Sequence, residues 1–305
     1  MHITITGKLG SGKSTISSIL NEKHSLEVYS TGKIQRQLAL ELGISTLEMN
    51  SVMSGDSKYD HMIDERVREI SLERADETIV FDSRMAWHFA VNSFRVFVTA
   101  DPRIAAKRVV ATPRGQEEQY SDIENAQENL HMRSIAENLR FKQIYDVDNF
   151  DYRNYDLVID SSYETPDTLS DIIYKEFLYI SENKESKILL ISPKSLYPTT
   201  DIKKISNDAL NEYIMDIAED RPIVPVSIAV LNGYHFVLDG HHRVLASLMR
   251  AQSFVNCKLA DKSDSLLLDN EENMLNQLKA IGLGTLKDYE AKVNFKYASY
   301  PAEYI

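Results

Sequence analysis

The fold is decided by one stretch near the N-terminus, Gly7-Lys8-Leu9-Gly10-Ser11-Gly12-Lys13-Ser14. It has the G-x-x-x-x-G-K-S pattern of a phosphate-binding loop. The β-branched run over residues 2–6 before it is typical of a strand, and the apolar spacing over residues 15–20 after it is typical of a helix. Because the pattern binds phosphate in this strand–loop–helix context, we predict a nucleoside triphosphate site here.

The residues of the loop predict how the triphosphate is held. Glycines allow backbone N–H groups to turn inward, and the N-terminus of the next helix adds a partial positive charge. Lys13 would reach the β- and γ-phosphates, and the Ser14 hydroxyl would ligate Mg²⁺. The alternative is a glycine-rich turn without a ligand. The predicted residues for binding ATP and Mg²⁺ are Gly7, Gly10, Ser11, Gly12, Lys13, Ser14 and Thr15.

The composition limits the class of protein. The chain has 305 residues, with 34 Lys and Arg against 46 Asp and Glu, and its net charge of −12 argues against a general nucleic-acid binder. No apolar run reaches the length of a membrane span, and the N-terminus has no leader pattern. A single cysteine, Cys257, forms no internal disulfide, so we expect a cytoplasmic protein.

Strand-like and helix-like segments alternate over the first part of the chain, which predicts a parallel α/β sheet with helices on both faces. The expected strands are 26–29, 78–82, 95–99 and 156–160, and the expected helical regions are 31–42, 46–75, 102–145 and 166–179. Residues 181–187 are polar and have no apolar periodicity. We therefore predict one domain over residues 1–180 and a second over residues 187–305.

The second part of the chain predicts a smaller α+β domain. Residues 187–191 read as a strand and residues 207–218 as an amphipathic helix. The dipeptide Asn232-Gly233 separates two strand-like runs, which is a strong hairpin signal because both turn residues need positive φ. The run Asp239-Gly240-His241-His242-Arg243 then leads into a helix through Arg250. An acidic, helix-like tail begins near Ser265.

Charged residues in the first part point to phosphoryl chemistry. Asp82 ends an apolar strand, where a carboxylate can hold Mg²⁺, although an ordinary strand-end aspartate is the alternative. Arg84 follows at the same edge of the sheet, where ligands bind in open α/β folds. Further arginines would neutralise a transferring phosphoryl group, although each taken singly could be a surface charge. These are Arg36, Arg103, Arg108, Arg114, Arg133 and Arg140.

Residues 1 to about 180 resemble the nucleoside monophosphate kinases, most closely the cytidylate kinase-like branch. The resemblance rests on Gly7 to Thr15, Ser30-Thr31-Gly32-Lys33-Ile34-Gln35-Arg36, Asp60 with Ile63-Asp64, Phe81-Asp82-Ser83-Arg84, Thr99-Ala100-Asp101-Pro102-Arg103, Arg133, Arg140 and Tyr155 to Asp160. It implies in-line phosphoryl transfer from Mg²⁺·ATP.

The same resemblance implies roles for individual residues. The acceptor nucleotide would be bound by Ser30, Arg36, Asp60 and Arg84. The phosphates would be contacted from the lid side by Arg103, Arg108, Arg133 and Arg140, with Arg108 also binding the cofactor. The implied catalytic group consists of Lys13, Arg133, Arg140 and Asp82, with Ser14 and Asp82 at the metal.

The segment Asp239-Gly240-His241-His242-Arg243 lies where a strand meets a helix, which is an anion-binding arrangement. A metal site at the two histidines and a purely structural helix cap are the alternatives. Residues from about 188 to 262 resemble the ParB/sulfiredoxin superfamily, particularly the branch with free-serine kinases. That resemblance implies a phosphate site at Asp239, Gly240, His241, His242 and Arg243, with His241 or His242 as an acid–base group near neutral pH.

Together these patterns predict a nucleoside monophosphate kinase that acts on CMP or dCMP and carries a C-terminal nucleotide- or phosphate-binding module. Two alternatives remain. The C-terminal domain could phosphorylate free serine or another small hydroxyl metabolite, or the chain could be a nucleotide-gated regulatory protein. We expect a nucleotide or small-molecule substrate and neither membrane nor nucleic-acid partners, and a homo-oligomer is compatible with the sequence.

Overall fold

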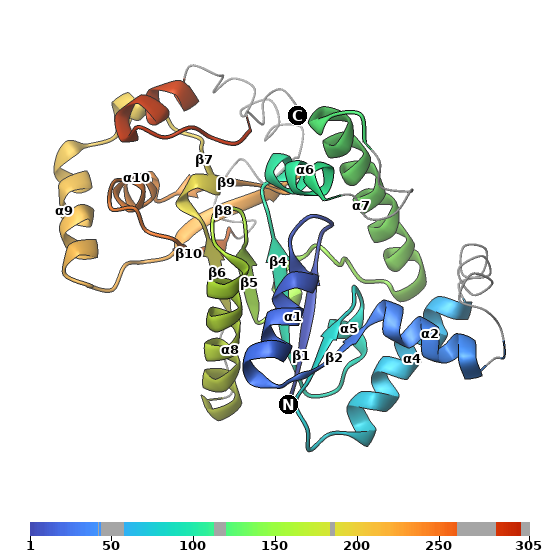
Figure 1. Ribbon diagram of the computed structural model, residues 1–305. Coiled ribbons are helices and arrows are strands. Elements are labelled where there is room, and N and C mark those ends of the chain that lie inside the picture. Colours follow the sequence, from blue (N-terminus) through green and yellow to red (C-terminus); the bar gives the residue numbers. More distant parts are fainter. Residues whose placement is uncertain (42, 44–57, 113–119, 184–186, 261–284, 300–305) are drawn as a thin grey trace. The chain divides into compact units, whose positions relative to one another are not determined.

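The computed structural model describes residues 1–41, 43, 58–112, 120–183, 187–260 and 285–299. Its contacts divide the chain into two compact units, each built from separate stretches of sequence (Figure 1). The first unit comprises Met1–Val98, Glu137–Val158 and Thr165–Lys187. The second unit comprises Thr99–Ala136, Ile159–Glu164 and Ile188–Ile305. The domain boundary between residues 180 and 187 stays a prediction from sequence.

Strands and helices mostly alternate from the N-terminus to residue 183. In chain order they are β1 (His2–Gly7), α1 (Lys13–His24), β2 (Glu27–Ser30), α2 (Thr31–Glu41), α4 (Lys58–Glu73), β3 (Ile79–Asp82), α5 (Ala86–Phe89), β4 (Ser93–Thr99), α6 (Pro102–Ala111), α7 (Ile123–Tyr145), β5 (Leu157–Asp160) and α8 (Pro166–Asn183). A 3-10 turn, η1, covers Tyr152–Asn154.

The later elements are shorter and mix strand directions. They are β6 (Ile188–Ile191), η2 (Pro193–Ser195), β7 (Leu196–Pro198), η3 (Ile202–Lys204), α9 (Asn207–Ala218), β8 (Val226–Leu231), β9 (Tyr234–Asp239), α10 (His241–Met249) and β10 (Val255–Leu259). Residues 285–293 are also helical. The full set is an α/β arrangement of mixed strands with helices.

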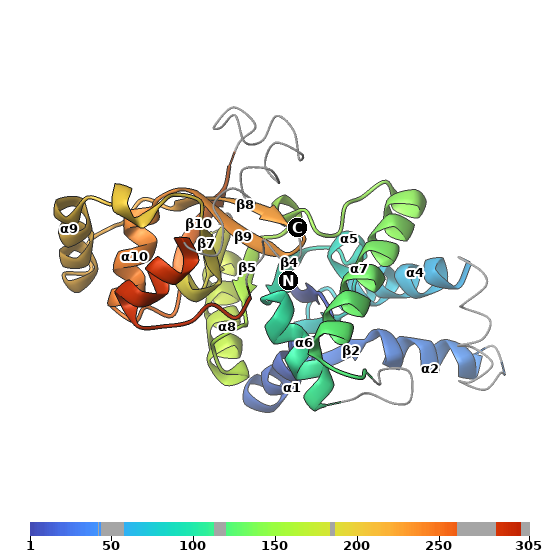
Figure 2. The same cartoon turned by 90° about the horizontal axis from the view of Figure 1, so that it is seen from above.

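In the first unit, four strands run parallel in the order β2-β3-β1-β4. Strands β1 and β3 are buried along their whole length, as the continuous apolar runs of a parallel sheet require. Helices α2 and α4 lie side by side in both views (Figures 1 and 2). They pack on β3 and α5 through a core that includes Ile34, Val67 and Phe81. The predicted parallel sheet is confirmed for these strands.

In the second unit, the strand order is β6-β10-β8-β9-β7, with parallel and antiparallel pairs. The predicted hairpin is confirmed because β8 and β9 pair antiparallel around Asn232 (φ 52°) and Gly233 (φ 89°). Helices α9 and α10 lie side by side (Figure 2). The core contains Tyr197, Phe236 and Leu245, and residues of the helix over 285–293 pack into it.

A buried carboxylate organises one part of the second unit. Asp101 is 2% exposed and caps the N-terminus of α6 by accepting a hydrogen bond from the backbone N–H of Arg103 at 2.9 Å. It also accepts from the hydroxyls of Tyr197 at 2.6 Å and Ser299 at 3.0 Å. Burial and the neighbouring carboxylate raise the pKa of Tyr197 well above its usual range, so the phenol stays a donor. Asp101 therefore links three distant stretches of chain.

Most predicted elements appear within a few residues of their expected bounds. The helix over 207–218 matches α9, and the strand over 95–99 starts earlier, at Ser93. Two short strands, β7 and β10, were not predicted from the sequence. Parts of the expected helical regions 46–75 and 102–145 lie outside the described residues, as does the start of the tail after Ser265.

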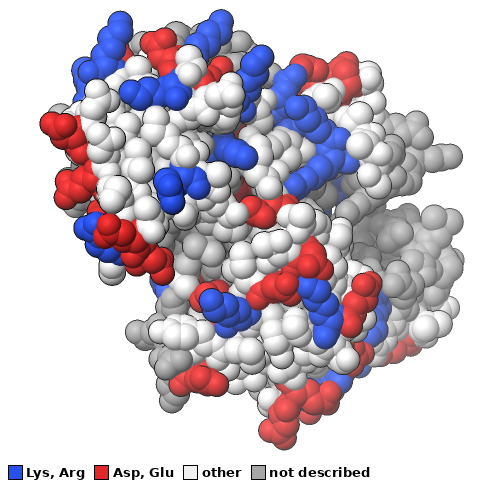
Figure 3. Space-filling view, turned by 60° about the vertical axis from the view of Figure 1, so that its left-hand side comes forward, with Lys and Arg blue, Asp and Glu red and all other residues white. Residues whose placement is uncertain are grey.

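None of the helices described is long and apolar enough to cross a membrane. Lys and Arg side chains lie among Asp and Glu side chains on the face displayed in Figure 3. This face therefore differs from the continuous basic surface that typifies nucleic-acid binding.

Candidate functional site

The glycine loop joins β1 to α1 and leaves the helix N-terminus open to an anion. Gly10 (φ 77°) and Gly12 (φ 85°) adopt left-handed conformations that favour glycine. Gly12 is the N-cap of α1, and neither a side-chain cap nor an acidic residue occupies its first turn. The backbone N–H groups at this end of the helix and its dipole therefore favour a phosphate.

Gly7 is required by a close approach at the end of β1. A side chain there would overlap the carbonyl oxygen of Val98, the β4 residue paired with Gly7. It would also lie 2.9 Å from the Ser11 hydroxyl, which the loop folds back over β1. Because one of the two obstacles is backbone, the loop can close over the strand only with glycine at this position.

Strand register gathers the candidate residues of the first unit at one edge of the sheet. Asp82 pairs with Ile5 of β1 on one side and with Ser30 of β2 on the other. The Thr6 hydroxyl donates to the carbonyl oxygens of Ser83 at 3.2 Å and Arg84 at 3.4 Å. The end of β1, the end of β3 and the segment carrying Arg84 are thus fixed beside one another.

The donor groups at this edge suit Mg²⁺ bound together with a nucleotide. Asp82 is a strand-end carboxylate that is 9% exposed, and Ser14 has an exposed position on the first turn of α1. Within the described residues there is no group of three His, Cys, Asp or Glu side chains able to hold a metal alone. Mg²⁺ usually takes one or two protein ligands and completes its shell with phosphates and water, so this pair fits.

Of the residues predicted to bind the acceptor and of lid-side Arg140, some have described side chains and some do not. Arg84 forms an ion pair with Glu137 of α7, and the Ser30 hydroxyl accepts from the backbone N–H of Lys33 at 3.2 Å to cap α2. Arg140 is exposed, with its guanidinium 5.5 Å from the ring of Phe141. The side chains of Arg36 and Asp60 lie outside the description.

The lid-side arginines of the second unit are held by local partners. Arg108 donates to the carbonyl oxygen of Ser161 at 2.6 Å and to its hydroxyl at 3.0 Å, and burial lowers the pKa of this arginine. Arg103 pairs with Glu124 at 2.7 Å. Arg133 is exposed on α7, and Arg114 lies outside the described residues. Since these arginines belong to the second unit, their grouping with the glycine loop remains a prediction.

Two participants at the first unit's site were missed by the sequence reasoning. Lys8 is a variable position of the loop pattern, and its ammonium lies 4.6 Å from the centre of the Phe150 ring. Burial lowers the pKa of Lys8 to about 8, against the opposing effect of Asp148. Glu137 forms the ion pair with Arg84. Glu137 could have been identified from the sequence, because it lies between the predicted residues Arg133 and Arg140 on one helix.

The side chains of Asp239 to Arg243 are largely occupied by the fold of the second unit. Nε2 of His241 accepts from the backbone N–H of Thr199 at 3.1 Å, and Nε2 of His242 accepts from that of Ser206 at 3.0 Å. Arg243 donates to the carbonyl oxygens of Val224 and Pro225. The two histidines thus hold both ends of the segment between β7 and α9 by hydrogen bonds to its backbone.

The acid–base role expected for His241 or His242 stays a prediction, and burial changes the state in which His241 would act. The ring is 8% exposed, and desolvation lowers its pKa to about 4. It therefore stays neutral and serves as an acceptor at neutral pH. Asp239, by contrast, is 78% exposed and also pairs with Arg243, so the outward charge here is negative. A phosphate site at this segment remains a sequence prediction, while the contacts support the structural alternative.

Lowering the pH is expected to destabilise the protein through His241. Its pKa falls from 6.5 to about 4 on folding, so between these values the unfolded chain binds more protons than the folded chain. The free energy of unfolding therefore decreases as the pH falls, by about 2–3 kcal/mol between pH 7 and 4.5. Urea unfolding at both pH values measures the free energy of unfolding. Its decrease from pH 7 to pH 4.5 should be smaller for His241→Asn than for the wild type. His24→Gln is the control, and an unchanged pH dependence in His241→Asn would contradict this assignment.

Removing the Arg243 guanidinium should destabilise the second unit strongly. Arg243→Ala leaves the carbonyl oxygens of Val224 and Pro225 without their donor. It also removes the guanidinium of α10 that pairs with Asp239. We expect a loss of about 3 kcal/mol in the free energy of unfolding, measured by urea denaturation. Arg250→Ala, at the exposed end of the same helix, should change it by less than about 0.5 kcal/mol. Equal effects of the two changes would rule out this role.

Comparison with known proteins gives consistent matches over the first part of the chain. The model of the cytidylate kinase-like family matches residues 2–163. A cytidylate kinase of Methanospirillum hungatei is 32% identical over 174 residues, which cover 57% of this chain and 94% of that protein. A cytidylate kinase of Methanocella arvoryzae is 33% identical over 175 residues, covering 57% and 95%.

One relative that is not named a cytidylate kinase has a similar sequence identity to this chain. The S-adenosylmethionine-dependent nucleotide dehydratase of Lacinutrix mariniflava is 34% identical over 188 residues, which cover 61% of this chain and 37% of that protein. Residues 164–305 lie outside the family match.

Proposed function

Because the chain belongs to the cytidylate kinase-like family and is a phosphotransferase, we propose that it transfers the γ-phosphoryl group of Mg²⁺·ATP to CMP or dCMP. The observation that carries this proposal is the register that lines up Ser30, Asp82 and the end of β1 beside the open N-terminus of α1. A nucleotide kinase needs a phosphate-binding helix end and a strand-end carboxylate at the same edge of the sheet.

The proposed mechanism assigns each group a separate task. The backbone N–H groups of the loop and Lys13 bind the β- and γ-phosphates. Ser14 and Asp82 would hold Mg²⁺, which would neutralise charge on the phosphates. Ser30 and Arg84 orient the acceptor, together with Arg36 and Asp60. Binding the acceptor phosphate requires Arg84 to exchange its ion pair with Glu137 for a phosphate oxygen. Lid-side Arg108, Arg133 and Arg140 stabilise the charge of the transferring group.

Release of ADP by the full chain tests the proposal. CMP, dCMP, UMP, AMP and free serine are offered separately with Mg²⁺ and ATP. The proposal expects turnover with CMP or dCMP. Turnover with serine alone would favour the kinase activity of the second domain, and ATP binding without any turnover would favour a nucleotide-gated regulator.

For residues 187–305 we propose a ParB/sulfiredoxin-like module, on the sequence resemblance alone. The contacts of His241, His242 and Arg243 support a structural task for residues 239–243 rather than phosphate binding. Titrating the full chain with CDP and CTP after Asp239→Ala tests nucleotide binding there. If the affinities for CDP and CTP are unchanged in Asp239→Ala, this segment does not bind nucleotide.

A further inference from the structure

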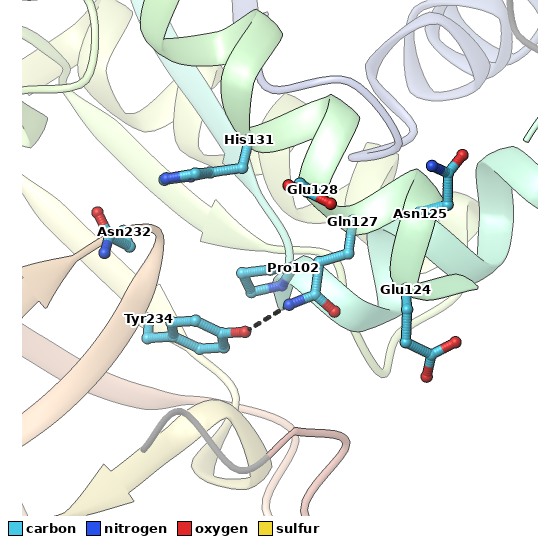
Figure 4. Close-up of a pocket in the computed structure, with 8 residues that line it drawn as sticks. All are labelled: Pro102, Glu124, Asn125, Gln127, Glu128, His131, Asn232 and Tyr234. Atoms are coloured by element: carbon cyan, nitrogen blue, oxygen red, sulfur yellow. Dashed lines mark hydrogen bonds between the residues drawn. The ribbon is translucent and has the colours of Figure 1, made fainter. Parts of the chain in front are cut away.

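A cavity of about 470 Å³ lies in the second unit beside the first half of α7 and the turn between β8 and β9 (Figure 4). Its volume is in the range of pockets that bind small molecules. None of the residues assigned above to nucleotide or acceptor binding lines it. The lining residues are Pro102, Glu124, Asn125, Gln127, Glu128, His131, Asn232 and Tyr234.

The α7 residues at this cavity form a polar stripe. Glu124, Gln127, Glu128 and His131 have the i, i+3, i+4, i+7 spacing of one helix face. Glu124 and Glu128 are exposed at the rim of the cavity, His131 is half-buried and Gln127 is buried. Two carboxylates, an amide and an imidazole therefore line the cavity from one helix face.

Gln127 supplies an independent sign of a ligand. It is 7% exposed and lines the cavity, with Nε2 donating to the Tyr234 hydroxyl at 3.0 Å (Figure 4). Its Oε1 is buried and has no hydrogen-bond partner among the described residues. Rotating the amide by 180° would exchange the two atoms and leave the nitrogen without a partner instead. A buried amide atom of this kind is costly unless a ligand satisfies it.

The charges select the kind of ligand. Glu124 pairs with Arg103, but Glu128 forms no ion pair with any described residue. An uncompensated carboxylate near a buried amide oxygen favours a cation that donates N–H hydrogen bonds. Pro102 and the Tyr234 ring add apolar surface to the same cavity.

We propose that this cavity binds a small aliphatic amine, such as a di- or polyamine. Its ammonium group pairs with Glu128, a second N–H donor reaches Oε1 of Gln127, and its methylene groups pack on Pro102 and Tyr234. None of its lining residues is assigned to nucleotide binding, and it does not depend on the phosphoryl-transfer proposal. Its ligand is therefore either an effector or an additional substrate.

Calorimetric titration of the full chain, without ATP, tests the site with putrescine, spermidine and the uncharged analogue 1,4-butanediol. We expect heat with the two amines and none with the diol. Glu128→Gln, an exposed and structurally mild change, should weaken amine binding by about tenfold or more. Gln127→Leu removes the amide and should also weaken it. Glu212→Gln, an exposed carboxylate of α9, is the matched control and should leave binding unchanged.

Three outcomes would overturn the proposal. They are no heat with either amine at about 1 mM, equal amine affinity in Glu128→Gln and wild type, and equal binding of the diol. Circular dichroism of each variant confirms that it is folded before titration. Because no nucleotide is present, a failure of CMP phosphorylation leaves this result unaffected.

Discussion

We expect Lys13→Ala to lower kcat/KM for the proposed phosphoryl transfer to CMP or dCMP by at least about a hundredfold. The loop leaves the N-terminus of α1 without a side-chain cap, and Lys13 is the first residue of that helix. Its ammonium is the side-chain charge that the loop pattern directs at the β- and γ-phosphates. Removing one preorganised group that stabilises developing charge costs on the order of 10²–10³ in rate. ADP release with each acceptor measures the effect.

A matched lysine on the same helix provides the control for Lys13. Lys23 lies in the last turn of α1, where it pairs with Asp167 at 2.9 Å and Asp171 at 2.8 Å. Lys23→Ala should leave kcat/KM within about twofold, because exposed ion pairs contribute little. If Lys13→Ala retains full nucleotide turnover, the glycine loop is not the site of transfer. Serine phosphorylation that persists in Lys13→Ala would move the chemistry to the second domain.

Gly7→Ala should unfold or severely destabilise the first unit and abolish ATP binding. The new methyl group would overlap the Val98 carbonyl oxygen, which is backbone in the last pair of the β1–β4 ladder. Neither strand can shift without breaking its ladder, so we expect a loss of about 3 kcal/mol or more in the free energy of unfolding. Urea denaturation and ATP titration of the variant measure the two effects.

Gly12→Ala separates steric overlap from backbone strain. Gly12 also has positive φ, at 85°, but a Cβ there would meet no atom within 4 Å. Only the left-handed conformation is then penalised, by about 1–2 kcal/mol. The order of stability should therefore be wild type, Gly12→Ala and then Gly7→Ala. If both variants lose the same stability, the overlap with Val98 does not explain the requirement for Gly7.

The sequence was most informative where a pattern is local. The loop glycines, the Asn232-Gly233 turn and the bounds of α9 were predicted because each depends on neighbouring residues. Strands β7 and β10 were missed because their partners β9, β8 and β6 are chosen by the tertiary fold, and β7 has only three residues. A run such as Leu196–Pro198 carries no periodicity by itself.

The candidate site shows the same limit at the level of side chains. The motif could assign Asp82 and Ser30 to one edge because parallel strands end together, and their register agrees. It could not show that Glu137 holds Arg84, since that pair depends on how α7 packs in the first unit. Nor could the sequence show that His241 is buried and has a lowered pKa, because burial depends on the tertiary fold.

The hydrogen bonds of Asp101 determine whether the N-terminal part of the chain can be separated from the rest. The carboxylate belongs to the stretch matched by the family model, yet it accepts from Tyr197 and Ser299, which lie beyond that match. A chain truncated after residue 183 would lose both donors and uncover the cap of α6. Division of the chain at this junction would therefore leave an incomplete N-terminal product, because the second unit contains residues from both sides of it.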